Sequence, residues 1–327
     1  VDGIVTLGLA RRFVGVSYVT ERRHVEYFDS AVGAMARSLS RALGGREVVF
    51  IDQTIDASAY LLWAGSGSDP GRYYLYRPAQ RQLRPLLAAN PRLEGLTLSQ
   101  VTPVTYPAAD GTMIPGYLTL PPGRTEVRGL PGIVLPHGGP SARDEGDFDW
   151  LAQSLAHAGY AVLQPNYRGS SGYGDAWYVN NGFQSWRLAI GDVSDGGRWL
   201  LSQGADASRL SIVGWSYGGY AALQSGVVAP DLFKSIVAIA PVTDLERMRR
   251  DTTRRFNGRW VRDFIGEGPH IRAGSPAQNA SAITAPVLMF HGTLDTNVVI
   301  EQGRIMHRAL QEAGRQSELV EFEGLEH

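Results

Sequence analysis

The sequence predicts an α/β domain with a mostly parallel sheet and helices on both faces, preceded by a segment of short β-strands. Three observations lead to this prediction. From about residue 91 onward, apolar strand-like runs alternate with helical stretches. Several of these runs are continuously apolar, as in a parallel sheet that is covered on both faces. Before residue 90, short runs rich in aromatic and β-branched residues are separated by turn signals.

The overall composition excludes several classes of protein. The chain has 327 residues, of which 43% are hydrophobic and 19% charged, so it is long enough for one large globular domain or two. Its formal net charge is -1 and no basic run is interleaved with aromatic residues, so we expect no nucleic-acid partner. The absence of cysteine excludes disulfides, thiolate metal sites and a cysteine nucleophile. No apolar run reaches the roughly 18 residues of a membrane span. The compartment, cytoplasmic or periplasmic, and the oligomeric state stay open.

Residues 1–90 are predicted to be the C-terminal portion of a β-propeller. An amphipathic helix is expected at 31–43, and strands are expected at 12–19, 24–28, 47–51, 60–64 and 73–76. Repeated strands closed by turns are typical of propeller blades. Because the segment holds only one or two blades, its sheet edges need further blades or another partner.

Residues 91–327 are predicted to form the α/β domain, after a linker at 87–96. Strands are expected at 116–120, 132–136, 160–164, 210–213, 236–240, 286–290 and 318–322. Helices are expected at 148–158, 190–202, 220–228 and 301–313. This alternation favours an open sheet whose ligand site lies at the carboxyl ends of the strands.

The organising motif of this domain is the segment 214–218, which reads Gly-Trp-Ser-Tyr-Gly. It joins an apolar strand to a helical run, and this is the context in which Gly-x-Ser-x-Gly indicates a nucleophile elbow. Ser216 is therefore the candidate nucleophile of an α/β-hydrolase domain. The glycines are expected because side chains there would collide with the neighbouring strand or helix.

A serine nucleophile needs a positioned base and an acid that orients the base. In this fold the acid and then the histidine follow the serine in the chain. His327 follows the last predicted strand, and Asp295 follows the strand before it, so we assign them as base and acid. The alternative for Asp295 is a cap of the helix near Ile300. Asp192 and Asp195 fall inside a helical stretch and are expected to be structural.

Backbone N–H groups are expected to stabilise the oxyanion. One donor is the amide of Tyr217, which follows the nucleophile. The other comes from the loop 137–140, which reads His-Gly-Gly-Pro after a predicted strand. We favour Gly139, with Gly138 as the alternative, because small residues let the main chain approach a substrate closely.

Taken together, these motifs resemble the prolyl oligopeptidase family of serine peptidases, in particular its acylaminoacyl peptidases and dipeptidyl aminopeptidases. The matching segments are 110–117, 137–140, 166–174, 214–219, 291–298 and 323–327. The resemblance implies hydrolysis of short peptides through an acyl-enzyme on Ser216, without metal or cofactor. It also implies a β-propeller before the hydrolase domain and a final helix after the histidine. We therefore expect 1–327 to be part of a longer enzyme.

The resemblance further implies which residues bind the substrate. Asn297 and Val298 are expected to contact it. Part of the segment 243–260 is expected to line the specificity pocket, with three possible wall residues, Met248, Thr252 and Phe256. Met248 and Thr252 stand where some relatives have tyrosines, which disfavours a preference for proline. An arginine of the same segment could hold a substrate carbonyl, and four candidates stay open: Arg249, Arg250, Arg254 and Arg255.

Three functions remain to be separated. The leading hypothesis is a serine peptidase of the acylaminoacyl-peptidase or dipeptidyl-peptidase kind. The second is a carboxylesterase, since the same fold and triad cleave esters. The third is a non-catalytic interaction protein built on a hydrolase scaffold. Preference for amides over esters separates the first two, and reaction of Ser216 with a serine-directed phosphonate separates both from the third.

Overall fold

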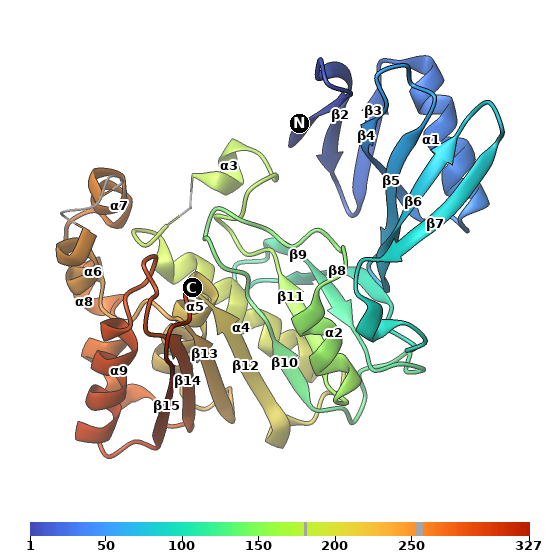
Figure 1. Cartoon of the computed structure of the whole chain (residues 1–327). Coiled ribbons are helices and arrows are strands. Elements are labelled where there is room, and N and C mark those ends of the chain that lie inside the picture. The colour runs from blue at the N-terminus through green and yellow to red at the C-terminus, as the bar shows by residue number, and fades with distance from the viewer. Residues whose placement is uncertain (180–181, 253–257) are drawn as a thin grey trace. The chain divides into compact units, whose positions relative to one another are not determined.

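The computed structural model describes residues 1–179, 182–252 and 258–327, and these residues form two compact units (Figure 1). Unit 1 consists of Val1–Val101 and Glu145–His157, and unit 2 of Thr102–Asp144 and Ala158–His327. The sequence had placed the division at residue 90. Unit 1 therefore includes eleven further residues and a segment of the chain that the sequence analysis had assigned to the α/β domain.

Unit 1 contains two antiparallel sheets and a helix between them in sequence. The three-stranded sheet has the order β1 (Gly3–Leu7), β2 (Arg12–Val19) and β3 (Arg23–Tyr27). The four-stranded sheet has the order β4 (Glu47–Gln53), β5 (Tyr60–Ser66), β6 (Asp69–Arg77) and β7 (Gln82–Ala88). Unit 1 also holds α1 (Ser30–Ala42), η1 (Pro91–Leu93) and α2 (Trp150–His157).

Helix α1 begins where its sequence provides a cap. The carboxylate of Asp29 accepts hydrogen bonds from the amides of Ala31 and Val32, which have no partner within the helix. The buried face of α1 packs in one apolar cluster with residues of both sheets, among them Val14, Phe50 and Leu62 of strands β2, β4 and β5.

Two strands of unit 1, β1 and β7, had not been predicted from the sequence. β1 is short, and β7 is mostly exposed and contains Pro85, which cannot donate to a ladder.

Unit 2 is organised around an eight-stranded sheet with the order β15-β14-β13-β12-β10-β11-β9-β8. Its strands are β8 (Val101–Pro107), β9 (Met113–Thr119), β10 (Gly132–Val134), β11 (Ala161–Pro165), β12 (Leu210–Trp215), β13 (Ser235–Ile239), β14 (Val287–Gly292) and β15 (Ser317–Phe322). The pairings from β11 through β10 to β15 are parallel, and β9 pairs antiparallel with β11. Of these strands, the sequence analysis missed only β8.

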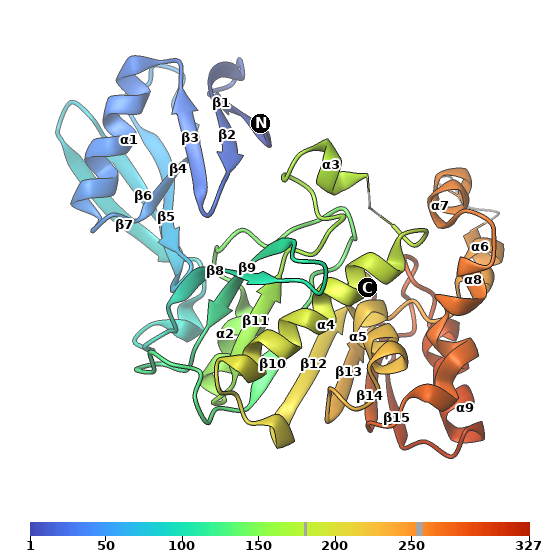
Figure 2. The ribbon, with the colours of Figure 1, turned by 180° about the vertical axis from the view of Figure 1, so that it is seen from behind.

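Helices of unit 2 cover the sheet and surround its carboxyl end. They are α3 (Asp175–Tyr178), α4 (Trp186–Ser202), α5 (Tyr217–Val228), α6 (Leu245–Asp251), α7 (Gly258–Ile265), α8 (His270–Ala273) and α9 (Glu301–Glu312), with the 3₁₀ segments η2 (Ala207–Arg209) and η4 (Pro276–Ala282). Helices α4 and α5 pack side by side over the central strands, as Figure 2 shows. The C-terminus lies at the strand ends where α5 begins (Figures 1 and 2).

One buried ion pair holds the loop after β11 against α4. Arg168 donates to both carboxylate oxygens of Asp192, and Nη2 lies 2.6 Å from Oδ1. The Arg168 side chain is 13% exposed and that of Asp192 only 1%. Asp192 therefore has the structural role that the sequence analysis expected. A buried pair of this kind is costly to break, because the remaining charge is left without a partner in a dry environment.

We expect Arg168→Met to lower the free energy of unfolding of unit 2 by about 3–5 kcal/mol, because it leaves the buried Asp192 carboxylate without its guanidinium partner. The matched control is Arg209→Met, since Arg209 pairs with Asp206 while 56% of its side chain is exposed. That change should cost about 1 kcal/mol or less. Denaturant unfolding followed by tryptophan fluorescence measures both. Equal losses in the two variants would contradict this account of Asp192.

Candidate active site

Ser216 lies at a sharp turn between β12 and α5, in a backbone conformation that few residues adopt. Its φ is 61° and its ψ is -118°. Such a conformation is strained for a residue with a Cβ, so the surroundings must enforce it. The amide of Ser216 donates to the carbonyl of Ile239 at 2.8 Å, and its own carbonyl accepts from Tyr220 at 3.0 Å. These two bonds hold the serine on β13 and on the first turn of α5.

Two flanking glycines make this turn possible. A Cβ on Gly214 would overlap the carbonyl of Gly218, and a Cβ on Gly218 would overlap the carbonyl of Pro136 in the loop after β10. Both obstacles are backbone atoms, which cannot move away as a flexible side chain can. The Gly-x-Ser-x-Gly spacing therefore follows from how closely strand, turn and helix approach one another.

Asp295 and His327 meet at the ends of the next strands. His327 Nδ1 lies 2.6 Å from Asp295 Oδ2, and Asp295 Oδ1 accepts from the amides of Asn297 and Val298 at 2.9 Å each. The Asp295 side chain is buried, and His291 Nε2 lies 3.4 Å from its Oδ2. Burial alone would raise the pKa of Asp295, but hydrogen bonds from His291, His327 and the Val298 amide lower it well below its usual range.

The chain that leads to His327 is held by the loop after β14. The amide of Thr293 donates to the carbonyl of Phe322 at 2.9 Å, and the amide of Leu294 donates to the carbonyl of Leu325 at 3.0 Å. The terminal segment also passes directly over Gly292, where a Cβ would overlap the Leu325 carbonyl. These contacts place the imidazole of the last residue against Asp295.

The two glycines predicted for the oxyanion site lie beside the elbow. A Cβ on Gly138 would be 3.2 Å from the Trp215 carbonyl and 3.5 Å from Ser216 Cβ. Gly139 is exposed, has a φ of 118° and lines the same cavity as Ser216. Tyr217, the third predicted oxyanion residue, begins α5 directly after the serine. The assignment of donors among these residues stays a prediction.

The loop that carries these glycines is held by the imidazole of His137. This ring stacks on Tyr167 at a centroid distance of 4.4 Å, and its Nε2 lies 2.8 Å from Ser170 Oγ. Nδ1 lies 2.8 Å from the Gly138 carbonyl, which only accepts, so Nδ1 carries the proton. Loss of hydration lowers the pKa of His137 to about 4, although the bond to Gly138 acts in the opposite direction.

A cavity of about 680 Å³ adjoins Ser216. Its lining consists of Gly139, Phe183, Ser216, Tyr217, Val242, Met248, Thr252, Trp260, Val261, Phe264, Thr296, Asn297, Val298 and His327. Eight of these had been named from the sequence, and Asp295 lies behind His327. The predicted wall residue Phe256 falls outside the described residues.

The aromatic wall of this cavity was missed by the sequence analysis. Trp260 stacks on Phe264 at 5.0 Å and 11°, and Phe183 meets Phe264 edge-on at 6.0 Å. Phe183 also packs on Tyr217 at 5.2 Å. The sequence feature that could have predicted this wall is the four-residue spacing between Trp260 and Phe264, which puts both side chains on one face of α7.

The arginine candidates receive no assignment from the structure. Arg249 pairs with Glu267 at 2.6 Å and with Glu246 at 3.2 Å. Arg250 is exposed at the end of α6. Arg254 and Arg255 lie outside the described residues. Thr252, by contrast, directs its hydroxyl back to the carbonyls of Met248 and Arg249 and so closes the last turn of α6.

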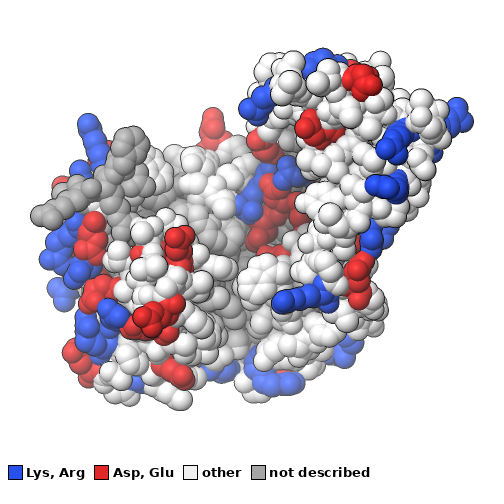
Figure 3. All heavy atoms as spheres, in the orientation of Figure 1, with Lys and Arg blue, Asp and Glu red and all other residues white. Residues whose placement is uncertain are grey.

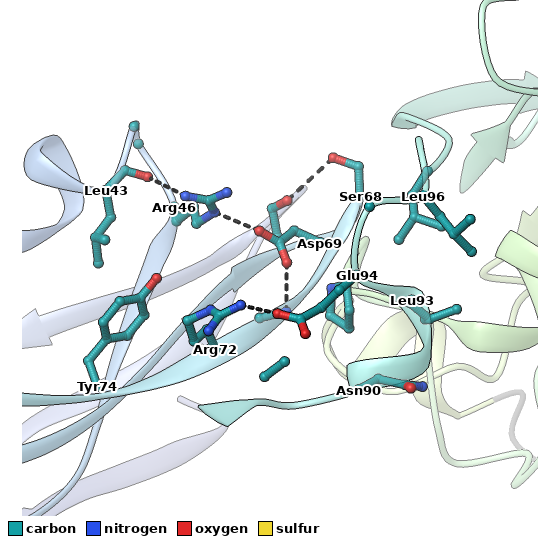
Figure 4. Close-up of a pocket in the computed structure, with 18 of the residues that line it drawn as sticks. Leu43, Arg46, Ser68, Asp69, Arg72, Tyr74, Asn90, Leu93, Glu94 and Leu96 are labelled. Atoms are coloured by element: carbon teal, nitrogen blue, oxygen red, sulfur yellow. Dashed lines mark hydrogen bonds and ion pairs between the residues drawn. The ribbon is translucent and has the colours of Figure 1, made fainter. Parts of the chain in front are cut away.

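A second hollow, of about 690 Å³, lies within unit 1 (Figure 4). Four of its five charged side chains form two ion pairs, Arg46 with Asp69 at 2.7 Å and Arg72 with Glu94, and the fifth is Arg22. Because the four paired charges neutralise one another, they do not define a ligand of either sign. Within the described parts of both units, no group of three His, Asp or Glu side chains is arranged to hold a metal ion. Among the same residues, no helix is long and apolar enough to cross a membrane.

Unit 2 thus has an α/β-hydrolase fold, with a serine at the elbow after β12 and an Asp–His pair after β14 and β15. The sequence model of the prolyl oligopeptidase family matches residues 146–327, more than half of the chain. The chain therefore belongs to the prolyl oligopeptidase family.

Individual proteins resemble this chain over part of their length. Dipeptidyl aminopeptidase BIII of Pseudoxanthomonas mexicana is 33% identical over 180 residues, which are 53% of this chain and 25% of that protein. A puromycin-hydrolyzing peptidase of Mycobacterium tuberculosis superposes with a TM-score of 0.78 at 22% identity, over 100% of this chain and 50% of that one. For the acylaminoacyl peptidase of Pyrococcus horikoshii the TM-score is 0.72 at 22% identity, over 86% and 46%. The chain thus spans between a quarter and a half of these proteins.

The loss of hydration at the half-buried ring of His137 predicts a pH dependence of stability. In the unfolded chain a histidine takes up a proton below about pH 6.5, whereas folded His137 resists protonation down to about pH 4. Between these values the unfolded state binds more protons, so the free energy of unfolding falls as the pH falls. We expect His137→Gln to remove part of this fall.

Denaturant unfolding at about pH 7.5 and about pH 4.5, on either side of the ordinary histidine pKa, measures the effect. His24→Gln serves as the control, because His24 is exposed in unit 1. That variant should keep the pH dependence of the parent. A His137→Gln protein whose stability falls as steeply as the parent's would overturn the assignment of a neutral imidazole.

Proposed function

We propose that the protein is a serine peptidase that hydrolyses short peptides through an acyl-enzyme on Ser216. One observation carries this proposal: Ser216 and His327 line one cavity, and His327 is hydrogen-bonded to the buried carboxylate of Asp295. A nucleophile, a base and an orienting acid are the groups that acyl transfer requires. Membership of the prolyl oligopeptidase family supports the same reaction.

In this mechanism Ser216 Oγ attacks the substrate carbonyl while His327 Nε2 takes the hydroxyl proton. Asp295 keeps the Nδ1 proton of His327 directed toward itself and stabilises the imidazolium that forms. The amides of Tyr217 and Gly139 receive the developing oxyanion, with Gly138 as the alternative second donor. His327 then passes its proton to the leaving amine. Water, deprotonated by His327, hydrolyses the ester on Ser216 and restores the serine.

The cavity favours a substrate with an apolar or aromatic side chain next to the cleaved bond. Phe183, Trp260 and Phe264 form its aromatic wall, with Met248 and Val261 nearby. Asn297 and Val298 follow Asp295 in the same lining, which supports the prediction that they contact the substrate. The relatives named above are a dipeptidyl aminopeptidase, an acylaminoacyl peptidase and a puromycin-hydrolyzing peptidase. We infer that this protein releases a short N-terminal unit from its substrates.

We further propose that unit 1 is the C-terminal part of a β-propeller whose remaining blades belong to a longer protein. A propeller blade is a four-stranded sheet. The antiparallel sheet β4-β5-β6-β7 has four strands, and strands that follow one another in the chain are neighbours in it. No nucleic-acid or membrane partner is proposed. On the face that Figure 3 shows, acidic and basic side chains are intermixed instead of forming one basic field.

The reaction class can be tested with three chromogenic substrates: an acetyl-alanine anilide, an alanyl-proline anilide with a free N-terminus, and a butyryl ester. The complete gene product should cleave an anilide, and Ser216→Ala should lower kcat/KM by about 10⁴-fold or more, because no other group can form the acyl-enzyme. The preferred anilide separates blocked from free N-termini. Cleavage of the ester alone would point to a carboxylesterase. If no substrate is turned over in a Ser216-dependent way, the hypothesis of a non-catalytic binding protein is favoured.

Asp295→Asn tests the orienting carboxylate. The new amide group presents a donor to His327, so the imidazole is expected to carry its proton on Nε2, where it cannot accept the serine proton. We expect kcat to fall by about 10⁴-fold with little change in KM. Asp206→Asn, at a surface carboxylate beside η2, should keep the parent kcat. Retention of more than about a tenth of the parent rate in Asp295→Asn would contradict the assigned role.

A further inference from the structure

A second histidine contacts the carboxylate of Asp295, and the mechanism above leaves it without a role. His291 lies at the end of β14, and its side chain is completely buried. Its Nε2 lies 2.8 Å from the Val298 carbonyl and 3.4 Å from Asp295 Oδ2. The sequence analysis had passed over this residue because it sits on a strand end.

The contacts of His291 settle which of its nitrogens carries the proton. A carbonyl oxygen only accepts hydrogen bonds, so Nε2, which faces the Val298 carbonyl, must be the N–H donor. Nδ1 has no hydrogen-bond partner among the residues described in either unit. A second proton on Nδ1 would therefore be buried without an acceptor, which is unfavourable. Nε2 of His291 thus carries a proton that it donates to the Val298 carbonyl, and Asp295 Oδ2 lies 3.4 Å from the same nitrogen.

The surroundings keep the ring in this position. Gly303 of α9 lies against it, and a Cβ there would be 2.9 Å from Nδ1. Across the sheet His291 pairs in register with Glu321, but that carboxylate is held by Arg304 at 2.8 and 2.6 Å. Asp295 is therefore the acidic group that His291 Nε2 contacts, and Arg304 neutralises the other carboxylate that faces its strand.

Oδ2 of Asp295 consequently lies between two imidazoles. His327 Nδ1 is at 2.6 Å and His291 Nε2 at 3.4 Å, while Oδ1 is occupied by two backbone amides. We propose that His291 is a positioning residue, which fixes the rotation and the charge of the Asp295 carboxylate so that Oδ2 stays directed at His327 throughout turnover. This proposal rests on the proposed function of the Ser216 site. The competing explanation is that His291 only holds the Val298 loop.

Two substitutions in the complete gene product separate these explanations. His291→Phe keeps a ring of similar size and removes the donor, whereas His291→Gln retains an N–H donor at a comparable reach. We expect His291→Phe to lower kcat by about 10–100-fold, as loss of the hydrogen-bond partner behind a functional ligand does in metal sites. KM should change little, and His291→Gln should recover most of the lost rate. A role confined to packing would not produce this difference between Phe and Gln.

A spectroscopic comparison tests the same point without turnover. The proton between His327 Nδ1 and Asp295 should give a low-field ¹H NMR resonance in the Ser216→Ala protein. Adding His291→Phe should shift or broaden this resonance, and adding His291→Gln should preserve it. Thermal unfolding shows whether each variant folds. If His291→Phe does not fold, Gly303→Ala displaces the ring instead and should have the same effect on kcat and on the resonance.

The outcomes distinguish the two proposals. If the parent has no Ser216-dependent turnover, the proposed function fails, and the resonance alone decides the role of His291. If the parent is active but His291→Phe matches His291→Gln in kcat and in the resonance, the positioning role is wrong. A uniform rise in KM with unchanged kcat would likewise overturn it, because it would assign His291 to the substrate-binding loop.

Discussion

The close approach of three main-chain segments at Ser216 is the constraint on which the rest of the site depends. β12 ends there, α5 begins there, and the loop after β10 passes within contact distance of both. Gly218 admits the carbonyl of Pro136, and Gly138 lies against the carbonyl of Trp215. One set of backbone contacts therefore fixes Ser216 and the loop of the predicted oxyanion donors. A side chain at either glycine would push these segments apart.

The hydrogen bond between Asp295 and His327 depends on a second constraint, the burial of a carboxylate that stays charged. Burial without partners would favour the neutral acid. Asp295 instead has donors on both oxygens, two amides on Oδ1 and His327 on Oδ2, and His291 Nε2 lies 3.4 Å from Oδ2. Parallel strands deliver these donors to one edge of the sheet, since β14 carries His291 and β15 leads to His327. The sheet topology thus supplies the hydrogen bonds that keep the carboxylate ionised.

The sequence was informative where a residue's position is set by its own strand. Ser216, Asp295 and His327 each follow a predicted strand, and parallel strands end at one edge, so their proximity could be anticipated. It was less informative where position is set by tertiary packing. The aromatic wall comes from α7 and from Phe183 in the loop before α4, neither of which has a motif. The role of His291 was hidden because only the structure shows which carbonyl its Nε2 faces.

A single buried amide connects the predicted specificity wall to the acid–base pair. Gln302, at the start of α9, accepts from the amides of Thr243 and Asp244 at 2.8 Å each and donates to the Asp244 carbonyl at 3.1 Å. Asp244 in turn caps α6, the helix that carries Met248. Because α9 begins just beyond the loop of Asp295, movement of that loop would be transmitted to the pocket wall through fully satisfied hydrogen bonds. Such a buried network is rigid when all its members are paired. The network therefore couples α6, which carries Met248, to the start of α9 through one buried side chain.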